Sequence, residues 1–416
     1  MDPLVLAGHL YALCLASKGS LDKTVSRFLR EHRQLPGEAR SVLVTTVYGM
    51  LRSRRWLEYA AGQIPGRLDR SALVQLYLLR AASPPGGNAP VLGRVDKAWR
   101  GAIHAANAAP LPIQCSLPDW LCTTLLEELG AVEGAEVARS LAGPAPTTLR
   151  TNELLASRDD VALALGRDGF DTKPTAHSPW GLVVQNPADL FRSESFQRGL
   201  FEVQDEASQL AALLADARPG QLVVDGCAGA GGKTLALAAM MQNKGRLLAF
   251  DVATHRLEDL KRRARRAQVH NLRVTALPPT SMGPLQRLVD KADVVFVDAP
   301  CSGTGILRRN PDTAWNLKPD DVERMRGQQE QILERYARLV KPGGRLVYAT
   351  CSVLRDENEA QVELLRQKRP DLEVEPASAA LARYGVDLPL EGHGLRLYPH
   401  RHGTDGFFAT VFVRRG

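Results

Sequence analysis

The chain of 416 residues is poor in cysteine and in aromatic residues, and it has no long apolar run. Its six cysteines are too sparse for a disulfide framework, and none forms the Cys-x-x-Cys pair of a structural zinc site. We therefore expect no metal site. No apolar run reaches the ~18 residues that cross a bilayer, so we expect no membrane span. The first three residues lack the basic start of a secretory signal, and we expect a cytoplasmic protein.

What is present is a globular composition, with 44% hydrophobic and 24% charged residues, in a chain long enough for two or three domains. The charge is uneven. Residues 1–110 hold 15 Lys+Arg and 7 Asp+Glu, whereas the remaining 306 residues hold 38 and 39. This basic excess suggests a polyanion-binding module, because phosphate contacts dominate the affinity of proteins for nucleic acids. Solvated helix faces that use arginine would explain the same counts equally well.

The front of the chain has helical spacing. Apolar residues recur at helical intervals from residue 4 to about 80, and a further helix is expected at 91–109. The proline- and glycine-rich stretch at 83–88 cannot continue a helix and predicts a loop. Asp119 is expected to cap a helix that runs to Leu129. These patterns predict an all-α domain at the start.

The pattern of expected secondary structure changes further along the chain. Strand–helix alternation at 147–184 predicts a small α+β module. Beyond residue 217, apolar runs alternate regularly with helical segments. The expected strands are the runs at residues 222–225, 246–251, 293–298, 345–350 and 407–413. Because continuous apolar strands separated by helices form a parallel sheet buried on both faces, the main domain is predicted to be α/β and Rossmann-like.

Three of these strands end in an acid, at the edge of the sheet where ligands bind: Asp225, Asp251 and Asp298. A glycine-rich turn follows the first acid. Its residues are Cys227, Ala228, Gly229, Ala230, Gly231, Gly232 and Lys233. Glycines at such a turn let the backbone approach a ligand closely.

The spacing of this turn separates the possible ligands. A P-loop would need glycine where Cys227 stands, and the dinucleotide pattern would need glycine where Thr234 stands. An acid at the end of the second strand can bind ribose hydroxyls. S-adenosylmethionine fits better than NAD, because it has no pyrophosphate and less need of that spacing.

Two cysteines follow equivalent strands, in the motifs DAPCSGTG with Cys301 and YATCS with Cys351. Enzymes that methylate exocyclic amino groups usually carry Asp/Asn-Pro-Pro-aromatic at the first of these places. A cysteine there indicates nucleophilic chemistry instead. Either cysteine alone could be a packing residue, since buried cysteine is common. Two strand-end thiols beside one cofactor crevice are hard to explain in that way.

The motifs DGCAGAGGKT, DAPCSGTG and YATCS together resemble those of the RNA 5-methylcytosine methyltransferases, in particular the bacterial RsmB-like (Sun or Fmu) branch that acts on 16S ribosomal RNA. FEVQDEAS resembles the segment that introduces the catalytic domain, and HRHGTDGFF resembles its closing hairpin. The front of the chain, with YGMLR, is similar to a NusB-like helical RNA-binding domain. The resemblance implies three domains: residues 1–115 NusB-like, 116–215 an α+β connector, and 216–416 the S-adenosylmethionine-dependent methyltransferase domain.

The resemblance also implies catalytic roles. Cys351 would be the nucleophile that adds to carbon 6 of cytosine, and Cys301 would promote loss of the 5-proton and elimination of the product. Asp298 would hydrogen-bond the edge of the base. Lys233 would line the same pocket and help to lower the thiol pKa. DNA cytosine-5 enzymes use the cysteine that corresponds to Cys301, after the strand at 293–298, as nucleophile, so the presence of Cys351 favours RNA as substrate.

For the cofactor, the resemblance implies that the turn at 227–233 passes under the methionine part of S-adenosylmethionine, with Asp251 at the ribose and Asp298 nearby. Two departures from the family pattern stand out. No acid follows the third strand, at residues 274–279, which leaves the adenine contacts open. Ala230 replaces a proline that is typical of the family, and this change is expected to loosen the turn.

The RNA contacts are expected from arginines. Arg308 and Arg309 follow the Cys301 motif and would grip phosphates, although an ordinary surface loop would have the same sequence. Arg52, Arg54 and Arg55 of the first domain complete the predicted set.

The overall interpretation is a monomeric RNA cytosine-C5 methyltransferase whose partner is RNA, most simply 16S rRNA. The alternatives are a tRNA or 23S rRNA target, or a catalytically inactive RNA-binding protein of ribosome assembly. The basic run at 261–266 lies on an expected helix, and it is interpreted as a solvated face rather than an RNA contact.

Overall fold

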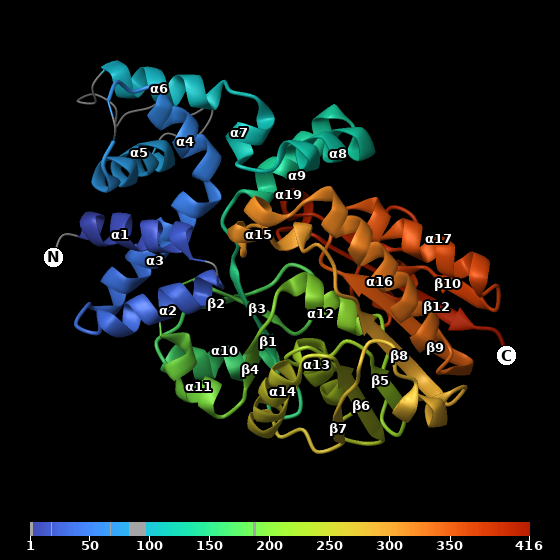
Figure 1. The fold of residues 1–416 in the computed structure, drawn as a ribbon. Helices are drawn as coiled ribbons and strands as arrows, with labels where there is room; N and C mark the ends of the chain where they lie inside the picture. The colour runs from blue at the N-terminus through green and yellow to red at the C-terminus, as the bar shows by residue number, and fades with distance from the viewer. Residues whose placement is uncertain (1–2, 18, 67, 83–96, 186–188) are drawn as a thin grey trace. The chain divides into compact units, whose positions relative to one another are not determined.

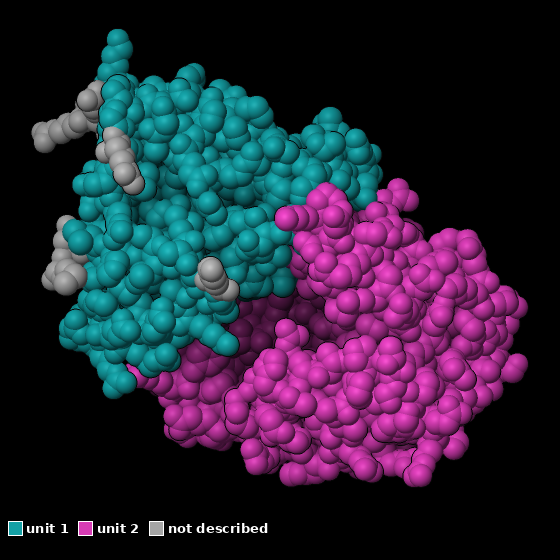
Figure 2. Space-filling view, in the orientation of Figure 1, with its two compact units in different colours: residues 1–144, 306–317 teal, residues 145–305, 318–416 magenta. Residues whose placement is uncertain are grey.

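The structure is a computed structural model, and it describes all but a few short segments of the chain (Figure 1). The described residues are 3–17, 19–66, 68–82, 97–185 and 189–416. They divide into two compact units, which Figure 2 colours separately. Unit 1 comprises residues 1–144 and 306–317, and unit 2 comprises residues 145–305 and 318–416. This division into two units does not test the domain boundaries predicted after residues 115 and 215, which stay a prediction.

Unit 1 is built from helices. They are α1 (Pro3–Ala16), α2 (Leu21–Glu31), α3 (Gly37–Arg52), α4 (Arg54–Gly62), α5 (Arg70–Ala82), α6 (Lys97–Asn107), α7 (Leu111–Cys115), α8 (Asp119–Leu129), α9 (Ala131–Leu141) and α15 (Pro311–Asn316). The helices predicted between residues 4 and 80 are confirmed. Of the helix predicted at 91–109, the described part is α6, and the loop predicted at 83–88 lies outside the described residues. Leu10, Met50 and Trp56 are fully buried in one apolar core.

The start of α8 differs from the prediction. Pro118 holds the N-cap position, Asp119 is the first helical residue, and no side chain caps this helix. The Asp119 carboxylate instead accepts a hydrogen bond from Arg55 Nη1 at 2.9 Å. The predicted cap is therefore wrong, although an acid in the first turn still interacts favourably with the partial positive charge of the helix N-terminus. The predicted end at Leu129 is confirmed.

Unit 2 begins with a small antiparallel sheet in the strand order β2-β3-β1-β4. Its elements are β1 (Thr147–Thr151), α10 (Arg158–Arg167), β2 (Thr172–Pro174), β3 (Gly181–Val184), η2 (Leu190–Arg192), α11 (Glu194–Gln197) and β4 (Phe201–Val203). Ser157 and Asp160 form a capping box at the start of α10. The predicted α+β module is confirmed.

The second sheet of unit 2 has the strand order β10-β12-β9-β8-β5-β6-β7, with β11 paired to β12. Its strands are β5 (Leu222–Asp225), β6 (Arg246–Asp251), β7 (Leu272–Ala276), β8 (Ala292–Asp298), β9 (Val340–Thr350), β10 (Leu372–Glu375), β11 (Leu395–Leu397) and β12 (Phe407–Arg414). Strands β5 to β9 run parallel, and β12 runs antiparallel to β9. All five strands expected from the apolar runs are present, and the predicted α/β Rossmann-like fold is confirmed.

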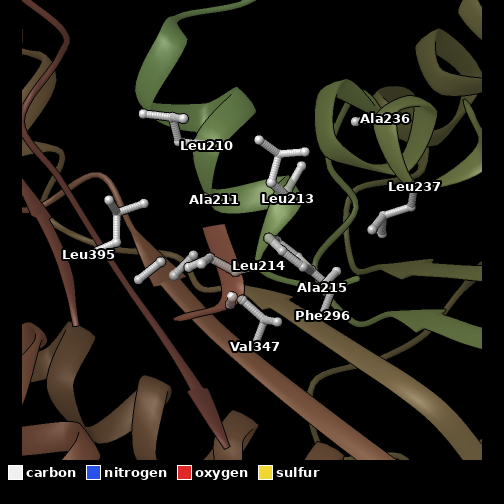
Figure 3. Close-up of a cluster of buried hydrophobic side chains, with 14 of the residues drawn as sticks. Leu210, Ala211, Leu213, Leu214, Ala215, Ala236, Leu237, Phe296, Val347 and Leu395 are labelled. Carbon is white, nitrogen blue, oxygen red and sulfur yellow. The ribbon is translucent and has the colours of Figure 1, made fainter. Parts of the chain in front are cut away.

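Helices cover both faces of this sheet. They are α12 (Glu206–Leu213), α13 (Gly232–Met240), α14 (Thr254–Arg266), α16 (Pro319–Ala337), α17 (Glu359–Lys368), α18 (Ala377–Ala382) and α19 (Pro399–His402), with the short turns η3 (Gly283–Leu288), η4 (Thr304–Ile306) and η5 (Arg355–Glu357). On one face Leu210 of α12 packs with Phe296 and Val347 of the sheet (Figure 3). On the other face Val295 packs with Tyr336 of α16. The alternation of side chains along each strand supplies both cores.

No helix among the described residues combines the length and the apolar character that a membrane span requires.

Candidate active site

The predicted site residues gather at one edge of the large sheet. Strands β9, β8, β5 and β6 are consecutive neighbours, and all four run in the same direction. Asp225, Asp251 and Asp298 are the last residues of β5, β6 and β8, and Cys351 directly follows β9. Since the carboxyl ends of parallel strands meet at one edge, the fold brings these residues to one edge of the sheet, as the sequence predicts.

The glycine-rich turn between β5 and α13 has the conformation that its glycines allow. Gly229 has φ +53° and Gly231 has φ +91°, backbone angles that residues with a side chain rarely adopt. A Cβ at Gly231 would lie 2.1 Å from a methyl carbon of Leu260, whereas a Cβ at Gly229 would meet nothing within 4 Å. The Gly229 N–H donates to Asp251 Oδ2 at 2.8 Å. The turn is therefore held from β6 and leaves open space above Gly229.

Asp225 lies under this turn. It is fully buried, and it accepts hydrogen bonds from the Thr234 hydroxyl at 2.6 Å and from the Cys227 N–H at 3.3 Å. Burial raises the pKa of Asp225 to about 7. Burial also raises the pKa of the Cys227 thiol well above its usual value, and the charges of Asp225 and neighbouring carboxylates add to this effect. Cys227 is therefore a neutral thiol and a poor nucleophile.

Lys233, at the start of α13, lies beside the last acid of β8. Its Nζ donates to Asp298 Oδ2 at 2.6 Å, and it lies 5.0 Å from the centroid of the Phe407 ring. The lysine side chain is largely buried, while about a third of the Asp298 side chain is exposed. The carboxylate thus has one oxygen engaged by lysine and a surface still open to a ligand.

The two cysteines, fifty residues apart in the chain, meet in the fold. Cys301 Sγ and Cys351 Sγ are 3.2 Å apart, and either can donate a hydrogen bond to the other. The Gly305 N–H donates to the Cys351 carbonyl at 2.9 Å and joins the two loops. The hydrogen bond to Cys351 raises the pKa of Cys301 well above its usual value, and burial and the charge of Glu357 act in the same direction.

A set of buried polar residues that the sequence analysis missed holds both cysteine loops. The Glu357 carboxylate accepts hydrogen bonds from the Ser302 N–H at 2.8 Å, from the Ser302 hydroxyl, and from Gln329 Nε2 at 3.0 Å. Asn358 accepts from the Thr350 hydroxyl at 2.5 Å and donates to the Ser352 carbonyl at 3.0 Å. The run Glu-Asn-Glu at 357–359, shortly after the second cysteine motif, is the only signal in the sequence that could have indicated them.

Comparison with known proteins places the chain in a family. The family model described as "16S rRNA methyltransferase RsmB/F" matches residues 212–413, and the model of the RsmF/B-like ferredoxin-like domain matches residues 117–190. A probable ribosomal RNA small subunit methyltransferase B of Synechocystis sp. is 30% identical over 422 residues, which cover 93% of this chain and 94% of that protein. The chain belongs to the RsmB/F family. It is therefore an S-adenosylmethionine-dependent RNA methyltransferase, as its motifs predict.

Two further similarities agree with membership of the RsmB/F family. The human protein named 28S rRNA (cytosine(4447)-C(5))-methyltransferase is 30% identical over 324 residues, which cover 73% of this chain and 38% of the human protein. The crystal structure of PH0851 has a TM-score of 0.80 at 26% identity and covers 99% of both chains.

The residues at this edge of the sheet suit S-adenosylmethionine chemically. The cofactor has a sulfonium, an ammonium group and two ribose hydroxyls, all of which interact well with carboxylates. Asp251 and Asp298 stand at the edge of the sheet beside the turn, Asp225 is buried beneath it, and Lys233 pairs with Asp298. The open space above Gly229 leaves room for the bound cofactor to pass over the backbone.

The basic run on α14 is only partly the solvated face that the sequence predicts. Lys261 and Arg262 are exposed and pair with acids of the same helix. Arg263 and Arg266, however, pair with the buried Glu202 of β4, and for Arg263 the distance is 2.9 Å. The solvated-face interpretation is wrong for these two residues, because the connector strand β4 supplies a buried acid beneath them.

Arg263 also reaches the cofactor turn. Its Nη1 donates to the Ala230 carbonyl at 2.7 Å, and a Cβ at Gly232 would lie 4.0 Å from its Nη2. An arginine side chain from α14 therefore holds the backbone at the residue where the sequence predicts a looser turn.

The five arginines predicted to bind RNA all lie in unit 1, and several are engaged there. Arg54 pairs with a glutamate of its own helix and lies over the Trp315 ring, and Arg55 pairs with Asp119. Burial lowers the pKa of Arg52, whose Nη1 donates to the Arg308 carbonyl at 3.3 Å. RNA binding by these arginines stays a prediction.

The two arginines of the Cys301 loop differ in accessibility. The Arg308 side chain is only 4% exposed, so a phosphate contact would require it to leave its buried position. Arg309 is half-buried and belongs to a small polar pocket. The pocket is lined by Ser20, Leu21, Asp22, Tyr48, Arg309, Asn310, Asp312 and Thr313.

Proposed function

We propose that this enzyme methylates carbon 5 of cytosine in 16S rRNA through a covalent adduct between Cys351 and carbon 6 of the base. The observation that carries the proposal is the pair of thiols 3.2 Å apart at the ends of the adjacent strands β8 and β9. The names of the family model and of the Synechocystis relative support small-subunit rRNA, and the name of the human relative supports cytosine-C5 chemistry.

The chemistry of the base explains why a thiolate is needed. Carbon 5 of cytosine is not nucleophilic in the free base. When the Cys351 thiolate adds to carbon 6, a carbon–sulfur bond forms and the electron pair of the 5,6 double bond becomes available at carbon 5. Bound S-adenosylmethionine supplies the methyl group that this carbon takes up. The base must leave any stack so that the thiol reaches one face of its ring.

The neighbouring residues take complementary roles. Asp298 accepts a hydrogen bond from the exocyclic amino group of cytosine, and the Lys233 ammonium offsets the negative charge that builds up on the ring as the thiolate adds. After methyl transfer, water takes the proton from carbon 5, the electron pair of that C–H bond re-forms the 5,6 double bond, and the bond between carbon 6 and sulfur breaks with its electron pair returning to the Cys351 sulfur. Cys301, hydrogen-bonded to the departing sulfur, favours this elimination.

A trapping experiment tests the assignment of the two cysteines. We expect Cys301→Ala to accumulate an RNA adduct that survives a denaturing gel, because elimination is impaired while addition proceeds. The matched variant Cys351→Ala and the double variant should give no adduct. A full yield of methylated RNA from Cys351→Ala would overturn the covalent mechanism.

The substrate is tested separately. Bisulfite sequencing of total RNA from a deletion strain should show one or more methylcytosines missing from 16S rRNA and restored by the native gene. Loss of a methyl group from tRNA or 23S rRNA instead would refute the 16S assignment and leave the cysteine chemistry intact. The monomeric state, the cytoplasmic location and the NusB-like front domain stay predictions.

A further inference from the structure

The thiols of Cys301 and Cys351 lie 3.2 Å apart, and the proposed function gives them different roles. Some feature of the protein must therefore decide which sulfur keeps its proton. Each cysteine follows a parallel strand and precedes a buried serine, but a backbone hydrogen bond from Gly303 lowers the pKa of Cys301, so keeping the proton there requires a stronger opposing effect. The difference lies in the residues that bind those two serines.

The loop of Cys301 is bound by a charged side chain. Glu357 has no exposed surface, and its carboxylate accepts hydrogen bonds from both the N–H and the hydroxyl of Ser302, the residue next to Cys301. Gln329 Nε2 donates both to this carboxylate and to the Pro300 carbonyl, at 3.0 and 2.9 Å. The negative charge is thus fixed on the Cys301 side of the pair.

The loop of Cys351 is bound by a neutral side chain. Asn358, which is also fully buried, donates to the carbonyl of Ser352, the residue next to Cys351. Its side-chain oxygen accepts from the Thr350 hydroxyl on the other side of the same cysteine. Consecutive residues of one turn therefore hold the two loops, one with a carboxylate and the other with an amide.

The other titratable groups around Cys301 do not cancel this asymmetry. Tyr348 of β9 is fully buried, its hydroxyl donates to the Glu357 carbonyl at 2.6 Å, and burial raises its pKa, so it is neutral. Asp298 of β8 has its charge paired with Lys233 of α13. The other titratable group in contact with Cys301 is the Cys351 thiol.

We propose that Glu357 is a positioning residue that keeps the proton on Cys301 and so leaves Cys351 as the thiolate of the pair. This inference rests on the proposed function for its mechanistic meaning. A nearby negative charge disfavours ionisation of a thiol. The Cys301 S–H then donates to the Cys351 sulfur and stabilises its thiolate. The same arrangement places a proton beside the sulfur that departs in the elimination step.

The test measures ionisation of Cys301 without RNA or cofactor. In the full-length Cys351→Ala protein, the rate of alkylation of Cys301 by iodoacetamide is followed against pH by mass spectrometry of its peptide. We expect Glu357→Gln to lower the midpoint of this profile by about one pH unit, and so to raise the rate about tenfold at neutral pH. The matched control is Glu359→Gln, a neighbouring acid that pairs with Arg396 and should leave the profile unchanged.

A second variant covers the case in which Glu357→Gln does not fold. In a Cys301→Ala background, Asn358→Asp places a charge on the Cys351 side and should slow the alkylation of Cys351 about tenfold at neutral pH. An unchanged profile in a folded Glu357→Gln protein, or an unchanged rate in Asn358→Asp, would overturn the proposal.

Failure of this inference can be told apart from failure of the proposed function. If the Glu357→Gln shift is found but no RNA adduct forms with Cys301→Ala, the proton placement stands and the covalent mechanism is wrong. If the adduct forms but the alkylation profile does not move, the mechanism stands and Glu357 has no part in dividing the roles.

Discussion

Replacing Arg263 by glutamine should weaken cofactor binding without a comparable effect on chemistry. Arg263 makes a 2.7 Å hydrogen bond to the Ala230 carbonyl and a 2.9 Å ion pair with the buried Glu202. Hydrogen bonds to charged groups contribute about 1.5–3 kcal/mol each. We assume that about half of the free energy of one such bond keeps the turn in the conformation that binds the cofactor. Losing it then weakens the binding free energy of the cofactor by about 1.4 kcal/mol, which corresponds to a tenfold weaker affinity.

The assay is steady-state methylation at varied S-adenosylmethionine, together with calorimetric titration of the cofactor. We expect Arg263→Gln to raise KM and Kd for the cofactor about tenfold and to change kcat less than about threefold, because Arg263 contacts the turn and not the cysteines. Arg262→Gln is the matched control. Arg262 is the adjacent residue of α14, it is exposed, and its pair with Asp259 should contribute little.

Equal cofactor affinities for Arg263→Gln and Arg262→Gln would refute the reasoning, since the two variants remove the same charge from the same helix. A loss confined to kcat would refute it as well. Arg263→Lys should lie between, because lysine restores a charge for Glu202 but cannot bond two partners with the geometry of a guanidinium.

Three further predictions concern unit 2. Burial raises the pKa of Asp225 to about 7 from an ordinary value near 3.8. Between these pH values the folded state binds more protons than the unfolded state, so the stability of the native protein falls as the pH rises. The Tm of Asp225→Asn should therefore rise relative to that of the native protein from pH 4 to pH 8, and a constant difference in Tm would contradict this. Peroxide should oxidise Cys301 and Cys351 to a disulfide, because their sulfur atoms lie close together. Mass spectrometry should show the loss of two hydrogens, activity should be lost, and a thiol reductant should reverse both changes. Retention of both thiols would contradict their proximity. Phe296→Ala, at a fully buried position of β8, should lower the free energy of unfolding by about 3–5 kcal/mol in denaturant titration, whereas Leu163→Ala of the same unit, 64% exposed, should leave it nearly unchanged.

The strands of the large sheet could be predicted because burial on both faces requires an uninterrupted apolar run. Strands β10 and β11 were missed. Leu372–Glu375 alternates apolar and acidic residues, and Leu395–Leu397 has only three residues, so neither has a run that stands out from a loop. Both segments are strands because their backbones pair with β12 through hydrogen bonds. Pairing between distant segments decides such short strands, and local sequence does not report it.

The side chains on α14 show the same limit. Helical spacing and the run of basic residues identify a polar helix, but they do not show which arginine meets an acid from β4. Glu202 is some sixty residues earlier in the chain, and it meets Arg263 and Arg266 because the small sheet lies against this helix. The bond from Arg263 to Ala230 likewise required the turn and the helix to be placed together.

The sequence by itself determined the kinds of reactive group in this protein and the strand ends at which they lie, because residue type and apolar spacing are local properties. The cofactor class, the pair of thiols and the edge of the sheet where they meet all follow from these. The tertiary structure alone decided the surroundings of each group. A carboxylate beside Ser302 and an amide beside Ser352 come from adjacent residues of one turn, and only the folded chain brings them under two loops fifty residues apart. Ionisation depends on charge and burial within a few ångströms, and the chain acquires both only when it folds.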